Sequence, residues 1–571
     1  MREEVAANLE SDVLVVGAGI AGLTAAIRAA EGGARVTIIS KGPVAGDGAA
    51  SWMAGWGFQA ALYPPDSPEA HARDTIRIGQ YLNDQELLLT LINEIPHCLR
   101  LLDRWGMRYL KSDGKYVQVR LPGASHARVP RLSRKGVEGG PEYRRLFPRQ
   151  LRRAGVRAIS NLQALELLKY DGVVVGVLAL DTVEGNFVAI RAKVTILATG
   201  GLMGMYRFTT TSPTLTGEGQ AMAYQAGAQL QDIEFADFYT STIVWPPFFA
   251  GDINWPTVLR FELSGKYYNS EGEEFLKNRR GSPLALPVLV QQEIAAGRCS
   301  PHGGVYLSFK HLLDTTIEDS LASMGRTRPV RALEALGIDI RQDALEVAPA
   351  PMESLGGCRI DSRCQTNVPG LLAAGEVAGG AEGAYTLAGN PMALYTAMGS
   401  IAGQQAASLI RGTDGVPDVL PDLRPSLEAA LRPLGNRVPG AVPVLEVRKE
   451  LEKVLKDHLH LLGRSEQTLT KAIGKILAIQ KDAERWQVRT STRRFNSEWI
   501  GALELRHMAT VCEMLARAAL ARKESRGLHY REDFPESSPD WLCNLLVQKD
   551  GEEMKVSKAP VSFPFVLPGE R

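Results

Sequence analysis

The stretch Asp12-Val-Leu-Val-Val-Gly17-Ala-Gly19-Ile-Ala-Gly22 decides how the chain begins to fold. Its short apolar, β-branched run is typical of a buried parallel strand, and it passes through GxGxxG into an Ala-rich segment that reaches Arg28. A second strand-like run, Arg35-Val-Thr-Ile-Ile, follows. Strand, glycine turn, helix and strand form the βαβ unit whose helix N-terminus presents backbone N–H groups to a pyrophosphate. A lone GxGxxG is a weak signal, but this context makes it specific and predicts a dinucleotide site.

Each glycine of this turn has a separate expected role. Gly17 makes the turn, Gly19 lets the backbone approach the phosphates, and Gly22 lets the helix pack closely on the strand. The second strand ends in Ser40 and Lys41, where many such units carry an acid for the ribose hydroxyls. A hydroxyl can still bond a ribose, but the acid-based preference for NAD is absent.

Composition excludes several classes of protein. The chain has 571 residues, which suggests roughly three or four domains. Hydrophobic residues make up 45% and charged residues 23%, as in ordinary globular proteins. The 65 Lys and Arg balance the 64 Asp and Glu, so no basic excess points to nucleic acid or to an anionic membrane surface.

The cysteines and the apolar runs narrow the choice further. The six cysteines are scattered without a CxxC, so we expect neither a metal site nor an iron–sulfur cluster held by this chain alone. Scattered cysteines and a polar N-terminus without an export pattern predict a cytoplasmic protein, with peripheral attachment to a membrane complex left open. No apolar run reaches the roughly 18 residues of a membrane span.

Small residues recur in further segments that suit a backbone lying against a flat ligand. They predict one large cofactor built from distant parts of the chain. These segments are Gly46 to Gly57, Val194 to Gly201, Thr216 to Gly219, Val368 to Glu376, and Gly389-Asn390-Pro391 followed by a helix through Ala407.

Together these motifs resemble the flavoprotein subunit family of succinate dehydrogenase, fumarate reductase, aspartate oxidase and adenylylsulfate reductase. The tail Glu524-Ser-Arg-Gly-Leu-His529-Tyr-Arg-Glu-Asp533-Phe-Pro looks like the family's C-terminal "ESRGxHxRxDxP" motif. The resemblance covers nearly the whole chain. It implies an α/β protein with a Rossmann-like FAD-binding domain, an inserted α+β capping domain and a C-terminal helical bundle.

Composition places the domain boundaries independently. Between Asp237 and Pro349 the glycine turns thin out and aromatic residues and Pro cluster, and a Pro-rich linker follows Gly412. Helix-period apolar residues then occupy Leu445 to Leu462, Glu466 to Trp486, and Gly501 to Arg522. We therefore expect an FAD-binding domain at 1–236 and 350–413, a cap at 237–349, and a helical domain at 414–571.

The resemblance carries FAD contacts onto named positions. It places Gly17, Gly19, Ala21 and Gly22 at the pyrophosphate, Ser40 and Lys41 on the adenosine side, Ser51, Ala54 and Gly57 on the isoalloxazine side, Thr199 and Gly200 near the ribose and phosphates, Glu218 near the flavin or ribityl chain, and Glu376 and Asn390 in the remaining cradle. The helix after Asn390 is expected to aim its N-terminus at the flavin N1/O2 edge. Some members tether FAD to a histidine at the position that is Ala50 here, and no histidine lies between residues 42 and 70, so we predict noncovalent FAD.

The substrate positions depart from the members that use dicarboxylates, which hold them with two histidines and two arginines. The two histidine positions hold Tyr239 and either Met352 or Glu353. The carboxylate-binding arginine is replaced by Thr386. The proton-donating arginine aligns with Pro287, although Arg260, Arg279 or Arg280 could take its place. Because a threonine cannot bind a carboxylate bidentately, these changes disfavour succinate, fumarate and aspartate as substrates.

Tyr239, Glu382 and Tyr385 are the candidate catalytic residues that remain near the expected flavin face. Tyrosines and an acid suit a neutral or cationic substrate, a thiol or an enone. Two function classes stay open. The first is an FAD oxidoreductase with its own small-molecule substrate, whose electron partner is a separate ferredoxin-like iron–sulfur subunit. The second is an electron-transfer flavoprotein that belongs to a larger redox complex and has no substrate of its own.

Overall fold

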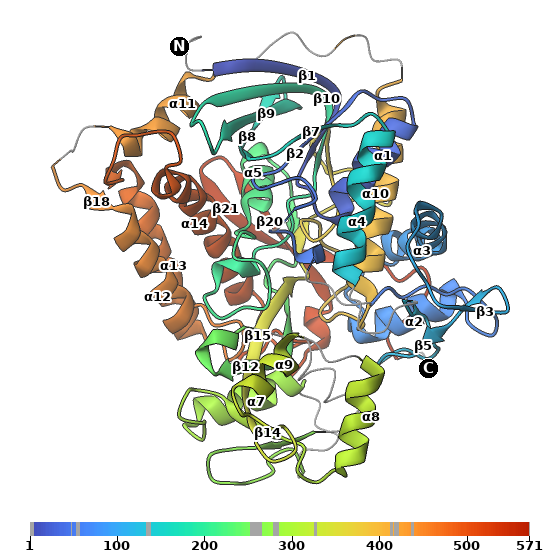
Figure 1. Cartoon of the computed structure of the whole chain (residues 1–571). Coiled ribbons are helices and arrows are strands. Elements are labelled where there is room, and N and C mark those ends of the chain that lie inside the picture. The colour runs from blue at the N-terminus through green and yellow to red at the C-terminus, as the bar shows by residue number, and fades with distance from the viewer. Residues whose placement is uncertain are drawn as a thin grey trace.

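The computed structural model describes residues 5–46, 48–52, 57–132, 139–251, 265–277, 285–324, 328–411, 415, 422–435 and 439–569. A mixed α/β arrangement fills this part of the chain (Figure 1).

The central sheet carries the predicted βαβ unit. Its strands lie in the order β7-β2-β1-β10-β9-β8, with β17 also paired to β10. β1 runs parallel to both β2 and β10, as a doubly wound sheet requires, whereas β9 is antiparallel to β10. β1 begins earlier than the motif indicated. The strands are β1 (Val5–Val16), β2 (Val36–Ile39), β7 (Arg157–Ile159), β8 (Leu162–Tyr170), β9 (Val173–Asp181), β10 (Phe187–Leu197) and β17 (Leu371–Ala373).

Two parallel helices pack on this sheet and set the spacing of the site. A Cβ added at Gly399 in α10 (Asn390–Leu409) would lie 2.3 Å from the Ala21 carbonyl oxygen of α1 (Ile20–Glu31). The next pair along both helices, Gly403 and Ala25, is equally close, so the two helices run in the same direction side by side (Figure 1). Because Gly399 is level with Ala21, α10 begins before α1 along their shared direction: Asn390 is level with a point eight residues, or about 12 Å, ahead of the first residue of α1. Two helix N-termini thus face the same region.

A second sheet forms the cap with its own core. Its strands are antiparallel in the order β12-β15-β14-β13, and its buried side chains include Ile243, Tyr267, Val290 and Val347. The first and last strands of the cap, β12 and β15, are neighbours, so the chain enters and leaves the cap at one place. The cap elements are β12 (Ala236–Trp245), β13 (Lys266–Tyr268), β14 (Val305–Ser308), β15 (Leu345–Ser354), α7 (Leu286–Ala295), α8 (Asp314–Met324) and α9 (Arg328–Ala335).

The C-terminal region contains the three predicted helices: α12 (Val444–Asp457), α13 (Glu466–Lys481) and α14 (Ser497–Ala521). It also contains a hairpin that the sequence pattern did not predict. Strands β20 (Cys543–Asp550) and β21 (Glu553–Pro560) extend a small sheet of order β16-β11-β20-β21, in which β11 is Leu230–Gln231 and β16 is Gly357–Cys358. The end of the chain is therefore tied to the segment that leads into the cap.

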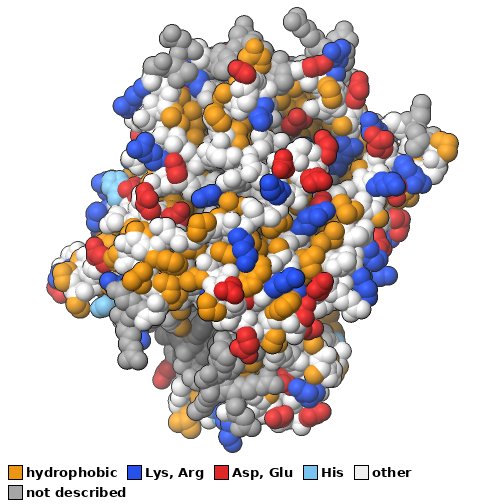
Figure 2. Space-filling model, turned by 180° about the vertical axis from the view of Figure 1, so that it is seen from behind, with side chains coloured by type: hydrophobic (Ala, Val, Ile, Leu, Met, Phe, Trp, Pro, Cys, Tyr) orange, Lys and Arg blue, Asp and Glu red, His pale blue; other side chains and the backbone are white. Residues whose placement is uncertain are grey.

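The remaining helices are α2 (Pro68–Ile78), α3 (Gln85–Trp105), α4 (Gly139–Arg153), α5 (Glu218–Ala226) and α11 (Arg424–Leu431). Among them, α5 lies against β8, α4 packs on α1, α3 packs on α10 and α2 packs on α3. On the face seen in Figure 2, Lys and Arg side chains are interspersed with Asp and Glu, in agreement with the net charge of +1. Within the described ranges, no helix combines the length and the apolar character that a bilayer crossing needs.

Candidate active site

A cavity of about 670 Å³ lies where the glycine turn, the start of α10, the cap strands and α14 meet. This volume is typical of a small-molecule or cofactor site. Its wall combines segments from the whole length of the chain, from Val16 to Glu504. The cavity therefore has the composite construction that the small-residue segments predicted.

The glycine turn has two glycines that the fold requires and one that it does not. Gly17 has a φ of +108°, and an added Cβ would lie 2.2 Å from the Ala198 carbonyl oxygen. A Cβ at Gly22 would lie 2.1 Å from the Gly17 carbonyl oxygen. At Gly19 the nearest atom would be the Ser51 hydroxyl oxygen at 3.4 Å, which is ordinary contact. Because Gly19 lines the cavity, its missing side chain leaves room for a ligand rather than for the protein.

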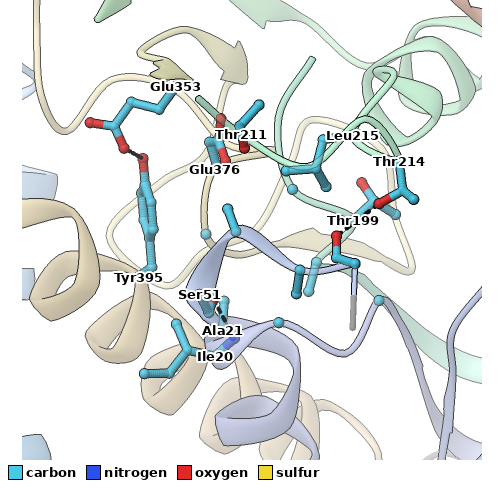
Figure 3. Close-up of a pocket in the computed structure, with 18 of the residues that line it drawn as sticks. Ile20, Ala21, Ser51, Thr199, Thr211, Thr214, Leu215, Glu353, Glu376 and Tyr395 are labelled. Atoms are coloured by element: carbon cyan, nitrogen blue, oxygen red, sulfur yellow. Dashed lines mark hydrogen bonds between the residues drawn. The ribbon is translucent and has the colours of Figure 1, made fainter. Parts of the chain in front are cut away.

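The first turn of α1 presents backbone donors to the cavity. The N-cap is Gly19, which has no side chain to cap these groups. The Ile20 N–H donates to the Ser51 hydroxyl oxygen over 3.0 Å, a contact drawn in Figure 3. Free N–H groups and the helix dipole favour an anion at this place.

Several buried polar side chains in the cavity wall have no partner within the described protein. They are Thr199 and Thr211, through their hydroxyls, and Gln163, through both atoms of its amide. An unsatisfied buried polar group costs roughly 1–3 kcal/mol, so such groups are normally paired in the working protein. A ligand with hydroxyl, phosphate and ring polar atoms, such as FAD, would satisfy them. Gln163 had no signal in the sequence, because it lies in a strand whose pattern shows only burial.

A buried ion-pair network closes one part of the cavity. The Lys41 ammonium contacts the Glu218 carboxylate and lies 3.1 Å from Oε1 of Glu504 on α14. Burial alone would lower the pKa of Lys41, but the two carboxylates outweigh it and hold this pKa above its usual value. The resemblance placed Lys41 on the adenosine side and Glu218 nearer the flavin, whereas the structure puts them in direct contact.

Most of the other predicted cofactor positions gather in the cavity, and a few do not. Gly22 packs behind the turn, and Asn390 is turned away from the cavity. The Asn390 side chain lies 2.8 Å from Nε2 of His71 and donates to the Thr75 hydroxyl over 2.9 Å. Ala54 lies outside the described residues. The wall contains Gly17, Gly19, Ala21, Ser40, Lys41, Ser51, Gly57, Thr199, Gly200, Glu218 and Glu376.

The candidate catalytic residues lie at the cap side of the same cavity. Tyr239 and Tyr385 are in its wall, together with Thr386. Glu382 is buried just behind the wall, where the Thr386 hydroxyl donates to its carboxylate. The structure thus brings the three predicted residues together, although their catalytic roles stay predictions. Pro287 does not line the cavity, and Arg260, Arg279 and Arg280 lie outside the described residues.

Two further residues at this end of the cavity belong to no recognised sequence motif. Asp237 of β12 lines the cavity, and so does Tyr395 of α10. The Tyr395 hydroxyl lies 3.1 Å from Oε2 of Glu382 and 3.3 Å from Oε2 of Glu353. Figure 3 shows Tyr395 and Glu353 pointing toward one another, away from Thr199 and Thr214. Helical spacing could have found Tyr395, because it lies one turn after Pro391, which also lines the cavity.

Burial gives this end unusual acidities. Burial, with nearby Glu382 and Asp237, raises the pKa of Glu353 well above its ordinary value. Burial likewise raises the pKa values of Asp237 and Glu382. The pKa of Tyr239 is raised by burial and then by Glu353, so its hydroxyl keeps its proton at neutral pH. Asp237, with a pKa of about 8, and Glu382, with a pKa of about 7, can therefore exchange protons near neutral pH.

One consequence of burial can be measured as a pH dependence. Burial raises the pKa of Glu376 from 4.5 to about 7. Because the folded state keeps a proton that the unfolded chain releases, the stabilising contribution of Glu376 is complete below pH 4.5 and is lost as the pH rises through 7. Glutamine does not titrate, so Glu376→Gln removes this loss of stability. Between pH 5 and pH 8 we therefore expect the unfolding temperature of Glu376→Gln to change in a more favourable direction than that of the unchanged holoprotein.

The comparison with the variant is needed because other groups titrate over the same range. Burial lowers the pKa of His71 to about 4, so the neutral histidine stabilises the fold increasingly as the pH rises. Thermal unfolding followed by circular dichroism gives both profiles. Parallel profiles for the two proteins would contradict the buried, protonated state of Glu376.

Comparisons with known proteins agree with this geometry. Residues 12–392 match the FAD-binding domain family, and residues 448–571 match the fumarate reductase flavoprotein C-terminal family. One subunit of the fumarate reductase (CoM/CoB) from Methanothermobacter marburgensis is 34% identical over 558 residues, which cover 96% of this chain and 99% of the relative.

Solved structures give the same result. Sdh1 of Mycobacterium smegmatis is 30% identical with a TM-score of 0.87, covering 98% of this chain and 96% of that one. Quinol fumarate reductase FrdA of E. coli is 26% identical with a TM-score of 0.88, covering 99% of both chains. The fold and these matches show that the chain is an FAD-dependent oxidoreductase belonging to the fumarate reductase and succinate dehydrogenase flavoprotein family.

Proposed function

We propose that this flavoprotein exchanges electron pairs with a small molecule other than succinate or fumarate and passes them to or from an iron–sulfur partner. The observation that carries the substrate part is the pair Thr386 and Glu382. A hydroxyl hydrogen-bonded to a buried acid stands where the dicarboxylate enzymes hold an arginine. A carboxylate at this place would meet an acid instead of a positive fork.

The charges of the cavity wall support the same conclusion. Among the described residues of the wall, Lys41 is the one cation, and Glu218 and Glu504 already neutralise it. Losing an oriented cationic clamp removes charge-assisted hydrogen bonds that are each worth roughly 1.5–3 kcal/mol. Dicarboxylate binding should therefore be weak in this protein.

Bound FAD supplies the two-electron redox chemistry, and this chain's own residues supply binding and proton transfer. Backbone N–H groups of the first turn of α1 would hold the pyrophosphate, and Glu376 would face the middle of the cofactor. The first turn of α10, which lines the cavity at Pro391 and Met392, would direct its positive end toward the flavin ring. Tyr239 and Tyr385, in the wall, and Glu382 behind it would exchange protons with the substrate.

An iron–sulfur partner is supported by what the chain does and does not contain. In the described part of the chain, no group of three or more His, Cys, Asp and Glu is arranged to hold a metal. The cysteines are free, and all but Cys299 are buried. The relative from Methanothermobacter marburgensis is named as a subunit, which indicates that it works with other chains.

The substrate proposal is tested with the purified holoprotein under anaerobic conditions. The oxidised flavin is mixed with small donors (amines, thiols, alcohols and succinate), and the photoreduced flavin with acceptors (enones and fumarate). We expect at least one compound that is not a dicarboxylate to change the flavin absorbance with saturable kinetics. If fumarate reoxidised the reduced flavin with saturable kinetics, and fast enough to support catalytic turnover, the proposal would be overturned.

The residue roles are tested by Tyr239→Phe with that same substrate. Loss of a positioned acid or base typically costs 10²–10⁴ in rate, so we expect kcat to fall by about 100-fold. Tyr170→Phe is the matched control, because Tyr170 is 49% exposed on β8. Equal rates for both variants would remove Tyr239 from the reaction.

The second candidate is an electron-transfer protein with a degenerate substrate end. The loss of the cationic clamp is compatible with it. It predicts that no small donor or acceptor turns over while reduced ferredoxin-like proteins reduce the flavin rapidly. The same panel separates the two functions.

We also expect FAD to be bound noncovalently, because Ala50, at the position of the tethering histidine, carries no nucleophile. Acid precipitation should release all the yellow colour into the supernatant, with a white pellet. A coloured pellet that stays coloured after washing in denaturant would contradict this prediction.

A further inference from the structure

Two buried acids face each other across neighbouring strands at the cap side of the cavity. Asp237 of β12 is the direct register partner of Glu353 of β15, and both line the cavity. Like charges directly opposite one another destabilise a sheet, and burial increases the cost. Because both acids face the cavity, a ligand bound there could offset this cost.

When its carboxyl groups are ionised, the cluster is short of hydrogen-bond donors. Tyr395 lies within reach of Glu353 and of Glu382, but a phenol has one proton and can donate to one carboxylate at a time. The second oxygen of Glu353, Oε1, is buried and has no partner in the described protein, and the residue, only 6% exposed, lines the cavity. A ligand that carries several N–H donors would satisfy these oxygens.

The cluster is also short of positive charge. The one cation in the described wall, Lys41, is paired with Glu218 and Glu504 and belongs to another part of the cavity. Burial raises the pKa values of Asp237, Glu353 and Glu382, and neighbouring carboxylates add to this for Asp237 and Glu353. A bound cation would lower the cost of ionising them, whereas a bound carboxylate would increase it.

We propose that the substrate of this end of the cavity is a small amine, bound as its ammonium ion between Asp237, Glu353 and Tyr395. An ammonium group supplies three donors and one positive charge, which are the two things the cluster lacks. This substrate class depends on the proposed function, in which the cavity receives a small molecule beside FAD.

The chemistry balances with the residues present. The ammonium first gives one N–H proton to an ionised carboxylate of the cluster. FAD, held by the glycine turn and the first turn of α1, would supply the two-electron acceptor. The α carbon of the neutral amine would give up a hydride to it, and the C–N single bond would become the C=N bond of an iminium ion. For a primary amine, addition of water and loss of ammonia give an aldehyde or ketone. The two electrons leave through the iron–sulfur partner.

Binding can be measured without turnover, from the change in flavin absorbance of the oxidised holoprotein. The probes are n-butylammonium, 1-butanol and butyrate, which share chain length and differ in charge. We expect n-butylammonium to bind about tenfold more tightly than 1-butanol or better, and butyrate to bind more weakly than either. Equal binding of the ammonium and the alcohol, or tightest binding of butyrate, would overturn the proposal.

Variants place the ammonium at the cluster. Glu353→Gln and Asp237→Asn should each weaken n-butylammonium binding by about tenfold or more while leaving 1-butanol unchanged. Glu346→Gln is the control on the same strand, because that carboxylate bonds Ser300 and His302 away from the cavity. The assignment would be contradicted if n-butylammonium binding weakened equally in Glu353→Gln, Asp237→Asn and Glu346→Gln, or if it weakened in none of them.

A second readout separates this proposal from the proposed function. If the ammonium binds as expected but no small donor reduces the flavin, the site is correct and the enzymatic function is wrong. If a thiol or an alcohol reduces the flavin and the ammonium does not bind, the enzymatic function stands and the amine class is wrong.

Discussion

Gly19→Val is expected to give a folded protein that is purified without its yellow colour. The protein leaves room for the Cβ of a side chain at this position, since an added Cβ meets no atom closer than 3.4 Å. The same side chain would occupy the space in which the backbone of the glycine turn approaches the phosphates. Losing two charge-assisted hydrogen bonds from backbone N–H groups costs roughly 3–6 kcal/mol, which lowers FAD affinity by about 100-fold or more.

Two further substitutions show that the effect belongs to the cofactor. Gly474→Ala makes a similar change in α13, where an added Cβ meets nothing within 4 Å, and it should keep both fold and colour. Gly22→Ala should instead impair folding, because its Cβ would lie 2.1 Å from the Gly17 carbonyl oxygen. Circular dichroism reports the fold, and titration of the colourless protein with FAD reports the affinity. A yellow Gly19→Val protein with unchanged affinity would show that the turn does not hold the pyrophosphate.

The cofactor end could be predicted because its constraints are local. Gly17 needs a positive φ and Gly22 needs close packing, and each need leaves a glycine at a fixed spacing after a strand. The close packing of the parallel helices α1 and α10 also depends on small residues. Their mutual approach through Gly399 was not visible in either segment alone, because it depends on a contact between residues far apart in the chain.

The substrate end could be predicted only in part, because it depends on contacts between distant segments. Sequence comparison located Tyr239, Glu382 and Thr386, and it showed that the positive clamp is missing. It did not show that Asp237 opposes Glu353, which is a matter of strand register, or that Tyr395 reaches two carboxylates. Periodicity indicates which face of an element is buried, but not which two faces meet.

The tail motif illustrates a similar gap. The resemblance identifies the segment around His529 as a family motif but does not show what it contacts. The structure shows that the adjoining end of α14 reaches the cap entrance, which is formed by the residues that precede the cap. Arg522, at the end of α14, is fully buried and donates to Glu234 over 2.7 Å, with Asp232 at 3.4 Å and Glu524 at 3.2 Å. Asp232 and Glu234 immediately precede β12, the strand of Asp237 and Tyr239. The C-terminal region thus fixes the strand that forms the substrate wall.

Arg522→Met is therefore expected to be among the most destabilising single changes in the chain. It removes one partner of a buried charge network and leaves Asp232 and Glu234 without their guanidinium, whereas Glu524 keeps its pairing with Arg526. Breaking a buried charge pair typically costs about 3–5 kcal/mol. The unfolding temperature of the holoprotein should fall on the order of 5 °C. Adding Glu234→Gln should recover part of the loss, because it removes one of the uncompensated charges.

The control for Arg522→Met is Arg424→Met, whose guanidinium pairs with Asp422 at the surface. The two side chains are 59% and 51% exposed, so this change should leave the unfolding temperature unaltered. Because Arg522 supports β12 from behind, its loss should also slow the substrate reaction more than it weakens FAD binding, since the glycine turn lies on a different element. If the Arg522→Met protein is as stable as the Arg424→Met control, Arg522 does not hold the cap entrance in place. If Arg522→Met weakens FAD binding as much as it slows the substrate reaction, Arg522 acts on the fold as a whole rather than on the substrate wall.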